Sequence, residues 1–477
     1  MAEGHVPDEE LAAFHRTVGR LRSLPADDPV RLRAEQVAAS FVRDGRQRRK
    51  RVRTGERSHA EAAVLGATAT GAPDRREDAP LAAPAEGAGG AGEYPRPRRC
   101  YVCKSLYQQA DSFYHALCPR CAADNAARRS LSTDLRGRRV LLTGGRVKIG
   151  FQLALMMLRD GAEVLVTSRF PHDTLRRFRA AEGSAIWWDR LTVVAVDLRD
   201  PRQVIGLCEG LAATGEPLDA LVNNAAQTVR RPPGSYAALT AGEGGPLPAA
   251  VIRAPGYRPM SALTGAGADG ASAVREVLGL APADVAGGVP EPGGGMPVLS
   301  SLPGAGIDEA GLLPDLSAAN SWSARIGELD PAELLETQLV NALAPALLAD
   351  RLLPLLLASP RPRRYIVNVT AVEGRFAVRN KTSGHPHTNM AKAALNMLTR
   401  TSGPELAARG VHMCSVDTGW ITDENPVPKK SRIAARGFRT PLDVIDGAAR
   451  VYDPIVRGEA GDPVSGVFLK DYHEAAW

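Results

Sequence analysis

The sequence lacks the long apolar segments of membrane proteins and secreted precursors. Its 477 residues contain no uninterrupted apolar run of about 18 residues. Residues 1–5 lack the basic-then-apolar order of a secretory signal. The hydrophobic fraction of 44% is nevertheless ordinary for a protein with a sizeable core, and the length predicts about two or three structural units. We therefore expect a cytoplasmic protein without a membrane span.

Aromatic residues are few, at 5% of the chain, and none lies in the most basic segment, residues 46–53. Such a segment can neutralise phosphates or acidic surfaces, but it offers no ring on which a base could stack. The net charge of +6 is modest for this length. We interpret the segment as a solvated, partly helical face, with nucleic-acid binding as a secondary alternative.

Cysteine is also scarce, with six residues, yet four of them lie close together in the sequence. Cys100 and Cys103 form one Cys-x-x-Cys pair, and Cys118 and Cys121 form a second. Two such pairs suit tetrahedral zinc, because each tight turn presents two thiolates, and disulfides are not expected in the cytoplasm. Four sulfur ligands leave no open coordination position. We therefore predict a structural zinc ribbon that supports local folding or docks a protein partner.

Composition divides the chain into four parts. Helical spacing of apolar residues predicts a basic helical arm at 1–65, and an Ala-, Gly- and Pro-rich stretch predicts a disordered linker at 66–98. The zinc ribbon occupies 99–130. From 134 to 477, short apolar strands alternate with helices, which predicts an α/β fold with a Rossmann-like doubly wound parallel sheet. The predicted strands are 138–142, 163–167, 191–196, 218–222, 364–369, 412–416 and 468–469.

This regular alternation fails between about residues 230 and 330, where Gly, Pro and Ala dominate. The segment follows the fourth predicted strand, so it lies at the carboxyl edge of the sheet, where ligands bind to such folds. Loops of this length are either functional or disordered. We expect an insertion, and both a substrate lid or partner surface and a flexible decoration remain open.

A glycine-containing turn, residues 143–150, follows the first predicted strand and opens a helix. Backbone amides at a helix N-terminus bind phosphate, and glycine is needed where a side chain would collide. Together with the Asn-Asn-Ala-Ala segment at 223–226, this turn resembles the cofactor half of the short-chain dehydrogenase/reductase family, a resemblance that extends over residues 134–477. Lys148 replaces the middle glycine of the family's motif, which is expected to narrow the turn and to add a positive charge.

The resemblance implies a bound dinucleotide. An NAD-preferring member usually offers an acidic side chain after the second strand, whereas this chain offers Arg169, which suits the phosphate of NADP. The other interpretation of Arg169 is an ordinary surface charge. NADP is the expected cofactor, and NAD is the alternative. The residues expected at the cofactor are Thr143, Gly144, Arg146, Lys148, Ile149, Gly150, Arg169, Asp197, Leu198, Asn224, Ala225, Lys392, Gly419 and Thr422.

The catalytic half of the resemblance is incomplete. Members of the family use Asn, Ser, Tyr and Lys, and here Asn341 and Lys392 match the first and the last. Thr388 stands at the Tyr position, one helical turn before Lys392, and Ala371 stands at the Ser position. His387 or its neighbour His385 could replace Tyr as the acid, and the alternative is that these histidines only hold the loop. The predicted catalytic residues are Asn341, Lys392, His387 and Thr388.

Two function classes remain open. The first is a divergent NADP-dependent oxidoreductase that acts on a carbonyl or alcohol, as the retained Asn341 and Lys392 favour. The second is a catalytically inactive dinucleotide sensor or scaffold whose zinc ribbon and basic arm bind a protein partner, as the missing Tyr and Ser favour. In the family, the helices around Leu343 and Leu395 commonly form dimer faces, so we expect a homo-oligomer that binds an unidentified small molecule.

Overall fold

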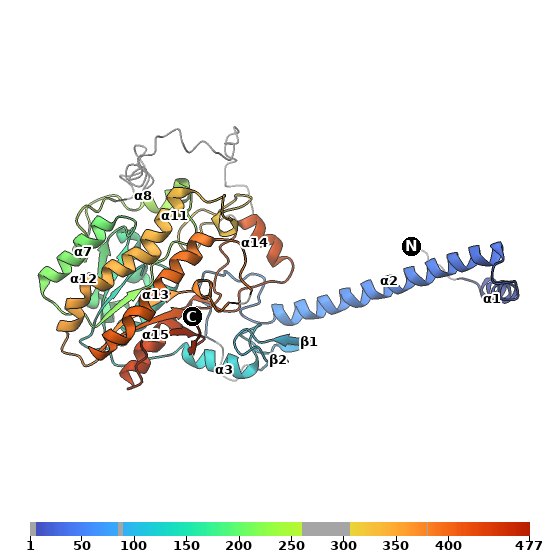
Figure 1. Cartoon of the computed structure of the whole chain (residues 1–477), viewed down its shortest axis with the longest axis horizontal. Helices are drawn as coiled ribbons and strands as arrows, with labels where there is room; N and C mark the ends of the chain where they lie inside the picture. The colour runs from blue at the N-terminus through green and yellow to red at the C-terminus, as the bar shows by residue number, and fades with distance from the viewer. Residues whose placement is uncertain (1–5, 84–88, 260–305, 379) are drawn as a thin grey trace. The chain divides into compact units, whose positions relative to one another are not determined.

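The computed structural model describes residues 6–83, 89–259, 306–378 and 380–477. Two units are distinguished within this part (Figure 1). The first comprises the chain up to Val64 together with Tyr94–Arg96, and the second comprises Leu65–Glu93 and Pro97–Trp477. The first unit is mainly helical, whereas the second contains the four clustered cysteines and the predicted sheet.

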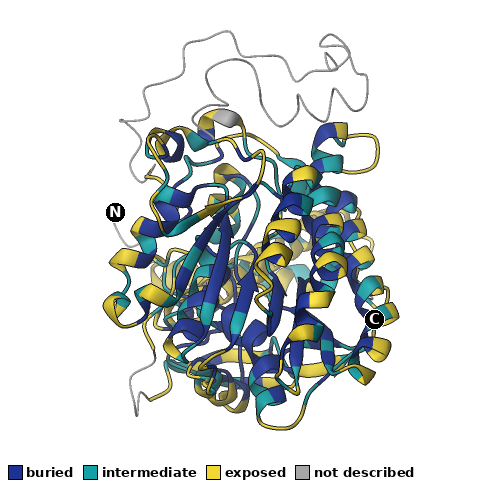
Figure 2. Cartoon of the chain, turned by 90° about the vertical axis from the view of Figure 1, so that its left-hand side faces the viewer, coloured by how far each residue is buried: buried dark blue, intermediate teal, exposed yellow. Residues whose placement is uncertain are grey.

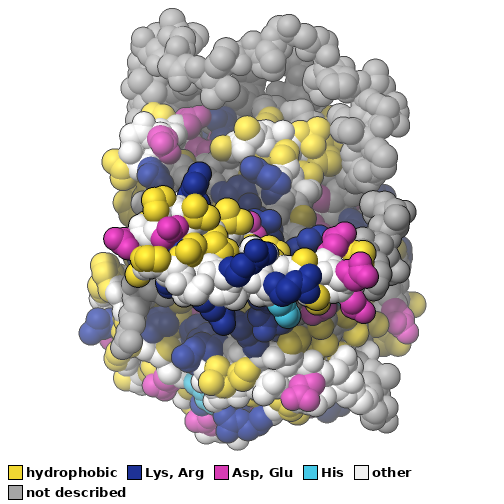
Figure 3. Space-filling model, turned by 90° about the vertical axis from the view of Figure 1, so that its right-hand side faces the viewer, with side chains coloured by type: hydrophobic (Ala, Val, Ile, Leu, Met, Phe, Trp, Pro, Cys, Tyr) yellow, Lys and Arg dark blue, Asp and Glu magenta, His cyan; other side chains and the backbone are white. Residues whose placement is uncertain are grey.

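The first unit contains helix α1 (Asp8–Arg22) and most of helix α2 (Pro29–Gly66). Asp28 begins α2, because its carboxylate accepts hydrogen bonds from two backbone amides of the first turn. Apolar side chains of both helices are exposed, among them Phe14 at 60% and Phe41 at 77%. Figure 3 shows hydrophobic side chains next to Lys and Arg on one face of the molecule.

The second unit is built on a nine-stranded sheet with the order β11-β10-β9-β8-β6-β3-β4-β5-β7. All neighbouring strands are parallel except β10 and β11. The prediction of a doubly wound parallel sheet is confirmed. The strands are β3 (Arg139–Leu142), β4 (Glu163–Ser168), β5 (Leu191–Ala195), β6 (Ala220–Asn223), β7 (Val251–Arg253), β8 (Arg364–Thr370), β9 (Val411–Asp417), β10 (Phe468–Lys470) and β11 (His473–Ala475).

Alternate residues of the strands enter two apolar cores, one on each face of the sheet. Figure 2 shows strands of the sheet that are largely buried. In β3, Val140 and Leu142 belong to one core and Leu141 to the other. Strands buried on both faces appear in the sequence as short apolar runs, which made them predictable. Among the described residues after β3, the helices of eight or more residues are α4 (Lys148–Arg159), α5 (Pro171–Ala180), α7 (Pro201–Thr214), α11 (Pro331–Gln338), α12 (Ala344–Ala358), α13 (Pro386–Ala408), α14 (Val427–Ala434) and α15 (Val444–Glu459).

One helical stretch, Pro331–Ala358, is long and apolar enough to cross a membrane by length and composition alone. Half of its most apolar window is buried inside the protein. Leu348 and Leu352 of this stretch belong to the core that α12 and α7 form with the sheet. We therefore interpret it as a core helix of the sheet.

The predicted disordered linker at 66–98 is ordered over its described residues, so this prediction is wrong for them. Strand β1 (Gly92–Arg99) pairs antiparallel with β2 (Leu106–Ala110). Thr70 is fully buried, and Arg75 donates hydrogen bonds to backbone carbonyls at positions 440 and 442. Composition could not show this, because the polar groups of the segment find partners far along the chain, 43 residues away for Thr70 and 365 for Arg75.

The predicted insertion contains regular structure in its described residues. Strand β7 adds an edge to the sheet by pairing in parallel with β5. The turn η2 (Pro233–Tyr236), helix α8 (Ala237–Ala241) and the turn η4 (Ser321–Ser323) flank the part that lies outside the described residues. The ends of the segment therefore belong to the folded second unit.

Candidate functional site

The turn between β3 and α4 is fixed by one threonine and two glycines. The Thr143 hydroxyl accepts hydrogen bonds from the backbone amides of Asn224 and Ala225, both at 3.0 Å, which joins the turn to the end of β6. Gly144 has a φ of +73°, and a Cβ there would lie 2.9 Å from Cα of Ala225. A Cβ on Gly150 would lie 2.1 Å from the Gly144 carbonyl oxygen. Both glycines are thus required by the packing of the turn.

Lys148 has a φ of +54°, in the left-handed region that favours glycine, so the turn carries local backbone strain at this residue. Helix α4 begins at this residue without a side-chain cap, which leaves its first amides available to a phosphate. Burial alone would raise the pKa of Glu424, but the charges of Lys148 and Lys430 outweigh burial and hold this pKa below its usual value.

The two arginines predicted near the phosphates differ in their surroundings. Arg146 donates hydrogen bonds to Oδ2 of Asp173 and to the carbonyl oxygen of Ala310, both at 2.8 Å. Its charge is therefore already compensated within the chain. The Arg169 guanidinium lies 5.6 Å from the ring centroid of Tyr236, and no carboxylate of the described residues lies within ion-pair distance of it. Arg169 is thus the arginine whose charge is available to an anion.

Asp197 adjoins Arg169 at the carboxyl end of β5. It pairs with Arg199 at 2.7 Å. Burial would raise the pKa of Asp197, but Arg199 and Arg169 hold it below its usual range. Leu198 belongs to one core of the sheet, and Ile149 packs against the other. Both residues therefore support the site through the apolar cores.

Asn341 lies where a π-helical turn, η5 (Leu339–Leu343), joins α11 (Pro331–Gln338) to α12. Its Oδ1 accepts a hydrogen bond from the backbone amide of Gln227 at 2.7 Å, and its Nδ2 donates to the Gln227 carbonyl at 2.8 Å. Single π turns inside helices frequently mark functional sites. Beyond these two bonds, the amide has a further N–H and lone pair that a water could use.

Lys392 is buried on α13. Its Nζ donates a hydrogen bond to the carbonyl oxygen of Val369 in β8 at 2.9 Å. Burial lowers the pKa of Lys392 to about 8, although the charge of Glu373 opposes the shift. Within the described part of the chain, no carboxylate forms an ion pair with this amine. A buried amine of this kind is costly to the fold and marks a candidate functional site.

His387 and Thr388 bring unpaired polar atoms to the same helix. Both ring nitrogens of His387 and Oγ1 of Thr388 are buried without a hydrogen-bond partner among the described residues. Buried polar atoms are rarely left unpaired in proteins, so these atoms indicate a place for water or a ligand. Burial, together with the charge of His385, lowers the pKa of His387. His385 itself stacks on Trp322, with 4.0 Å between ring centroids.

A cleft of about 520 Å³ opens at the N-terminus of α13. Its walls include Trp322, His385 and Trp420, together with Glu373 and Lys381. Trp322 comes from the predicted insertion, and Trp420 comes from the loop after β9. The described end of the insertion therefore lines the cleft.

Glu373 was not selected in the sequence analysis. It lies in the turn η6 (Val372–Gly374) after β8, which sits directly against the backbone of Lys392. Burial raises the pKa of Glu373, and the nearby Asp417 adds to this shift. The sequence did offer one signal for Glu373. It is an acidic residue two positions after Ala371, and Ala371 stands where the family has Ser.

The loop after β9 carries Gly419 and Thr422, two of the residues expected at the cofactor. Gly419 has a φ of +80°, and the Thr422 hydroxyl donates a hydrogen bond to Oε1 of Glu424 at 3.0 Å. Between them, the backbone amide of Trp420 donates to the phenolic oxygen of Tyr101 at 2.9 Å. The loop is thus held from outside the Rossmann fold, by a residue of the cysteine segment.

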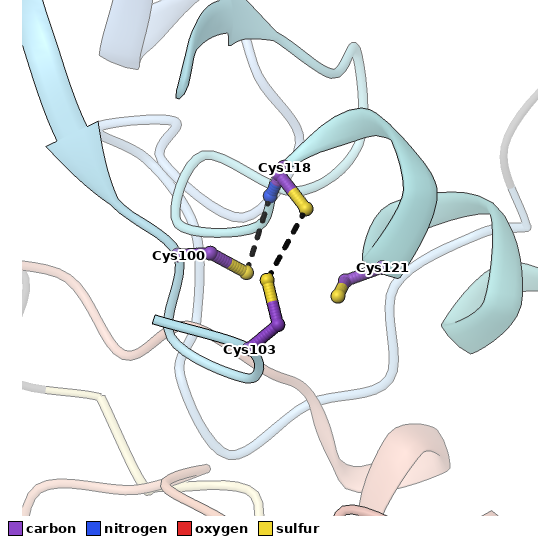
Figure 4. Close-up of side chains that lie close together, drawn as sticks. All are labelled: Cys100, Cys103, Cys118 and Cys121. Atoms are coloured by element: carbon purple, nitrogen blue, oxygen red, sulfur yellow. Dashed lines mark hydrogen bonds between the residues drawn. The ribbon is translucent and has the colours of Figure 1, made fainter. Parts of the chain in front are cut away.

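The four predicted metal ligands converge (Figure 4). Cys100 and Cys103 follow β1, whereas Cys118 and Cys121 lie at the start of α3 (Pro119–Arg128). Their sulfur atoms all lie within 4.8 Å of one another, and those of Cys103 and Cys118 are 3.7 Å apart. Tetrahedral thiolates at about 2.3 Å from zinc are separated by about 3.8 Å. The arrangement therefore fits a closed, structural zinc site.

Two family models match the second unit. One described as short chain dehydrogenase matches residues 138–239, and one described as Enoyl-(Acyl carrier protein) reductase matches residues 311–436. Neither covers residues 240–310, which fall within the predicted insertion.

Individual proteins are similar to the chain over different lengths. An uncharacterized protein of Acanthamoeba polyphaga mimivirus is 28% identical over 374 residues, which cover 75% of this chain and 71% of that protein. C-signal of Myxococcus xanthus is 30% identical over 136 residues, which cover 28% of this chain and 80% of that protein. A structure of a short chain dehydrogenase from Burkholderia cenocepacia in complex with NADP is 18% identical, covers 71% of this chain and 97% of that one, and gives a TM-score of 0.43.

Proposed function

Because the chain belongs to the short-chain dehydrogenase/reductase family, whose members are NAD(P)-dependent oxidoreductases, we propose that it uses NADP to interconvert a carbonyl group and an alcohol. One observation carries the proposal: Lys392 is buried beside the end of β8 with no ion pair among the described residues. Burying an amine is unfavourable for the fold, so a ligand that needs the amine explains its position.

The chain's groups fit a dinucleotide. The first amides of α4 are uncapped, and Arg169 is free for a phosphate. At the other end, the unpaired polar atoms of His387 and Thr388 mark a place where a ligand or water would complete the hydrogen bonding. NADP supplies or accepts the hydride when it is bound. Lys392 would hold its ribose, while Gly419 and Thr422 would hold its carboxamide.

Reduction of a carbonyl also requires a proton for the oxygen. Thr388 is a poor source, because an alcohol is a far weaker acid than the phenol usual at that position. The lowered pKa of His387 leaves its ring neutral near pH 7. Glu373 is better suited, since it lines the cleft and its raised pKa favours the protonated form. Its O–H bond would break as the proton passes to the substrate oxygen, leaving a carboxylate near Lys381.

The Glu373→Gln variant is expected to lower the reduction rate by about 10²–10³-fold, in the range for loss of a positioned general acid. In the wild type, the rate should fall as pH rises through the raised pKa of Glu373, because the proton is then lost, and the variant should lack this fall. The matched variant His387→Gln should keep it. If His387→Gln instead removes the pH dependence and Glu373→Gln does not, the histidine is the donor.

The Arg169→Ala variant is expected to weaken NADPH binding by about 10–100-fold, as for loss of a hydrogen bond between charged groups. NADH lacks the phosphate, so its affinity should stay unchanged. Calorimetric titration of both nucleotides measures the difference. Arg179→Ala is the control, because Arg179 is exposed on α5, where it stacks on Trp188. Equal weakening of NADH and NADPH would refute the assignment of Arg169 to the phosphate.

The second candidate is a catalytically inactive dinucleotide sensor or scaffold, supported by the missing Tyr and Ser. The same titration, followed by NADPH consumption with a panel of aldehydes and ketones, distinguishes the two. Micromolar binding with consumption supports the oxidoreductase. Binding without consumption of NADPH by any member supports the sensor, and absence of binding refutes both.

We further propose a cytoplasmic location, one structural zinc ion and a homo-oligomer. Leu395 is buried within the chain, but Leu343 before α12 and Met390 and Met397 on α13 are about half exposed. These apolar side chains are suitable for a contact between subunits. Analytical ultracentrifugation of the wild type measures the oligomeric state.

A further inference from the structure

The cysteine ribbon contacts the loop after β9, which is expected at the cofactor. Tyr101 lies between Cys100 and Cys103, and its phenolic oxygen accepts the hydrogen bond from the Trp420 amide. A Cβ on the neighbouring Gly419 would lie 3.5 Å from the same oxygen. The phenol therefore rests against two consecutive residues of the loop, and one of them, Trp420, lines the cleft.

Tyr101 also lies close to the base of this loop. The Nζ of Lys470 lies 5.3 Å from the centroid of the Tyr101 ring. Lys470 forms an ion pair at 3.5 Å with Asp417, the last residue of β9. The side chain of Tyr101 therefore contacts the loop directly at Gly419 and Trp420, and it approaches Asp417 only through Lys470.

The position of Tyr101 depends on the fold of the ribbon. Its backbone amide donates to the Ala116 carbonyl at 2.8 Å. This hydrogen bond links the first cysteine pair to the loop that precedes the second cysteine pair. A unit of about 30 residues rarely folds on its own apolar core, and metal binding then supplies much of its folding free energy. The far end of the ribbon is also anchored to helix α15 through Arg129 and Tyr114, so loss of the metal should loosen chiefly the turn of Cys100 and Cys103 that carries the phenol.

We propose that the metal-bound ribbon holds residues 418–422 in the form that binds the dinucleotide, with Tyr101 as the positioning residue. The expected effect on dinucleotide binding rests on the proposed function. The contact between Tyr101 and the loop can be tested without any cofactor. Zinc binding and dinucleotide binding are then coupled: loss of the metal weakens dinucleotide affinity, and bound dinucleotide slows loss of the metal.

The test compares the wild type, Tyr101→Phe and Tyr107→Phe, each as the full chain with its zinc content measured. Tyr107 is the matched control, because its hydroxyl bonds to the His115 carbonyl within the ribbon at 2.8 Å. Backbone amide hydrogen exchange at 418–422 is measured without cofactor, before and after removal of zinc by a chelator. NADPH affinity is then measured by calorimetry on the same samples.

We expect Tyr101→Phe to retain one zinc ion, to exchange three- to tenfold faster at 418–422 and to bind NADPH three- to tenfold more weakly. Removal of zinc from the wild type should produce at least the same changes, and Tyr107→Phe should match the wild type. Unchanged exchange in both Tyr101→Phe and the zinc-free wild type overturns the inference. Faster exchange without NADPH binding in any sample supports the contact and refutes the proposed cofactor.

Discussion

Replacement of Lys392 by methionine is expected to lower turnover by about 10²–10⁴-fold without destabilising the protein. Methionine fills much of the same space and carries no charge, so it removes the amine that would hold the ribose. The backbone carbonyl of Val369 loses its hydrogen bond, which is a smaller effect than burial of an ammonium. If Lys392 were retained only for folding, Lys392→Met would be less stable than the wild type. Its activity would then fall only as far as the folded fraction falls.

The pH dependence of stability provides a second readout for Lys392. In the unfolded chain a lysine titrates near about pH 10.4, whereas burial lowers the pKa of Lys392 in the folded protein to about 8. Between these values the unfolded state binds more protons, so the free energy of unfolding rises with pH. Below this window the folded protein bears a cost on the order of 3 kcal/mol for a shift of this size. Lys392→Met should remove both the cost and the rise.

The comparison uses urea unfolding at pH 7 and pH 9.5, with turnover measured on the same preparations. Lys50→Met is the control, because Lys50 is exposed on α2 and its charge is solvated in both states. It should leave turnover and the pH dependence unchanged. If Lys392→Met unfolds at a lower urea concentration than the wild type at pH 7, the lysine stabilises the fold and its assignment to the site is wrong.

The sheet could be predicted because its strands are buried on both faces and therefore stand out as apolar runs. Strand β7 could not, since its three residues lie in a Gly- and Pro-rich segment and form a strand only through pairing with β5. The error at residues 66–98 has the same origin. Arg75 and Thr70 are ordered by partners far along the chain, and local composition does not predict such partners.

Within the site, sequence reasoning located groups whose role depends on local spacing. The turn at 143–150 and the two cysteine pairs are of this kind, because neighbouring residues fix their geometry. The cleft is different, since Trp322, Glu373 and Trp420 come from three separate loops that only the folded sheet brings together. Likewise, nothing local distinguishes Arg146, which is paired with Asp173, from Arg169, which is free for an anion.

A buried ionic cluster joins the end of the ribbon to helix α15, and it carries the second large prediction. Arg129 donates to Asp443 at 2.7 Å and to Asp446 at 3.1 Å, and its side chain is 6% exposed while theirs are fully buried. The hydroxyl of Tyr114 donates to Asp446 at 2.6 Å. Burial, to which Asp443 adds, raises the pKa of Asp446. Arg129 is the ion-pair partner of both carboxylates among the described residues, while Arg75 and Arg450 act on them from a greater distance.

Arg129→Met is therefore expected to lower the free energy of unfolding by about 3–5 kcal/mol, because it removes the ion-pair partner of two buried carboxylates. The matched control is Arg136→Met. Arg136 pairs with Asp134 at 2.6 Å, but the two side chains are 83% and 59% exposed, so its loss should leave the free energy of unfolding nearly unchanged. Urea unfolding at pH 7 measures both variants. If both variants lowered the free energy of unfolding equally, burial would not determine how much these ion pairs contribute to stability.

The same variant predicts a change with pH of defined sign. Without Arg129, the pKa values of Asp443 and Asp446 in the folded protein should both lie above their unfolded values, so the folded state binds more protons as the pH falls. The stability deficit of Arg129→Met relative to the wild type should then shrink between pH 7 and about pH 5. A constant deficit would mean that the lost free energy comes from packing of the arginine side chain. Because this cluster anchors the ribbon that carries Tyr101, a shrinking deficit should be accompanied by slower amide exchange at 418–422.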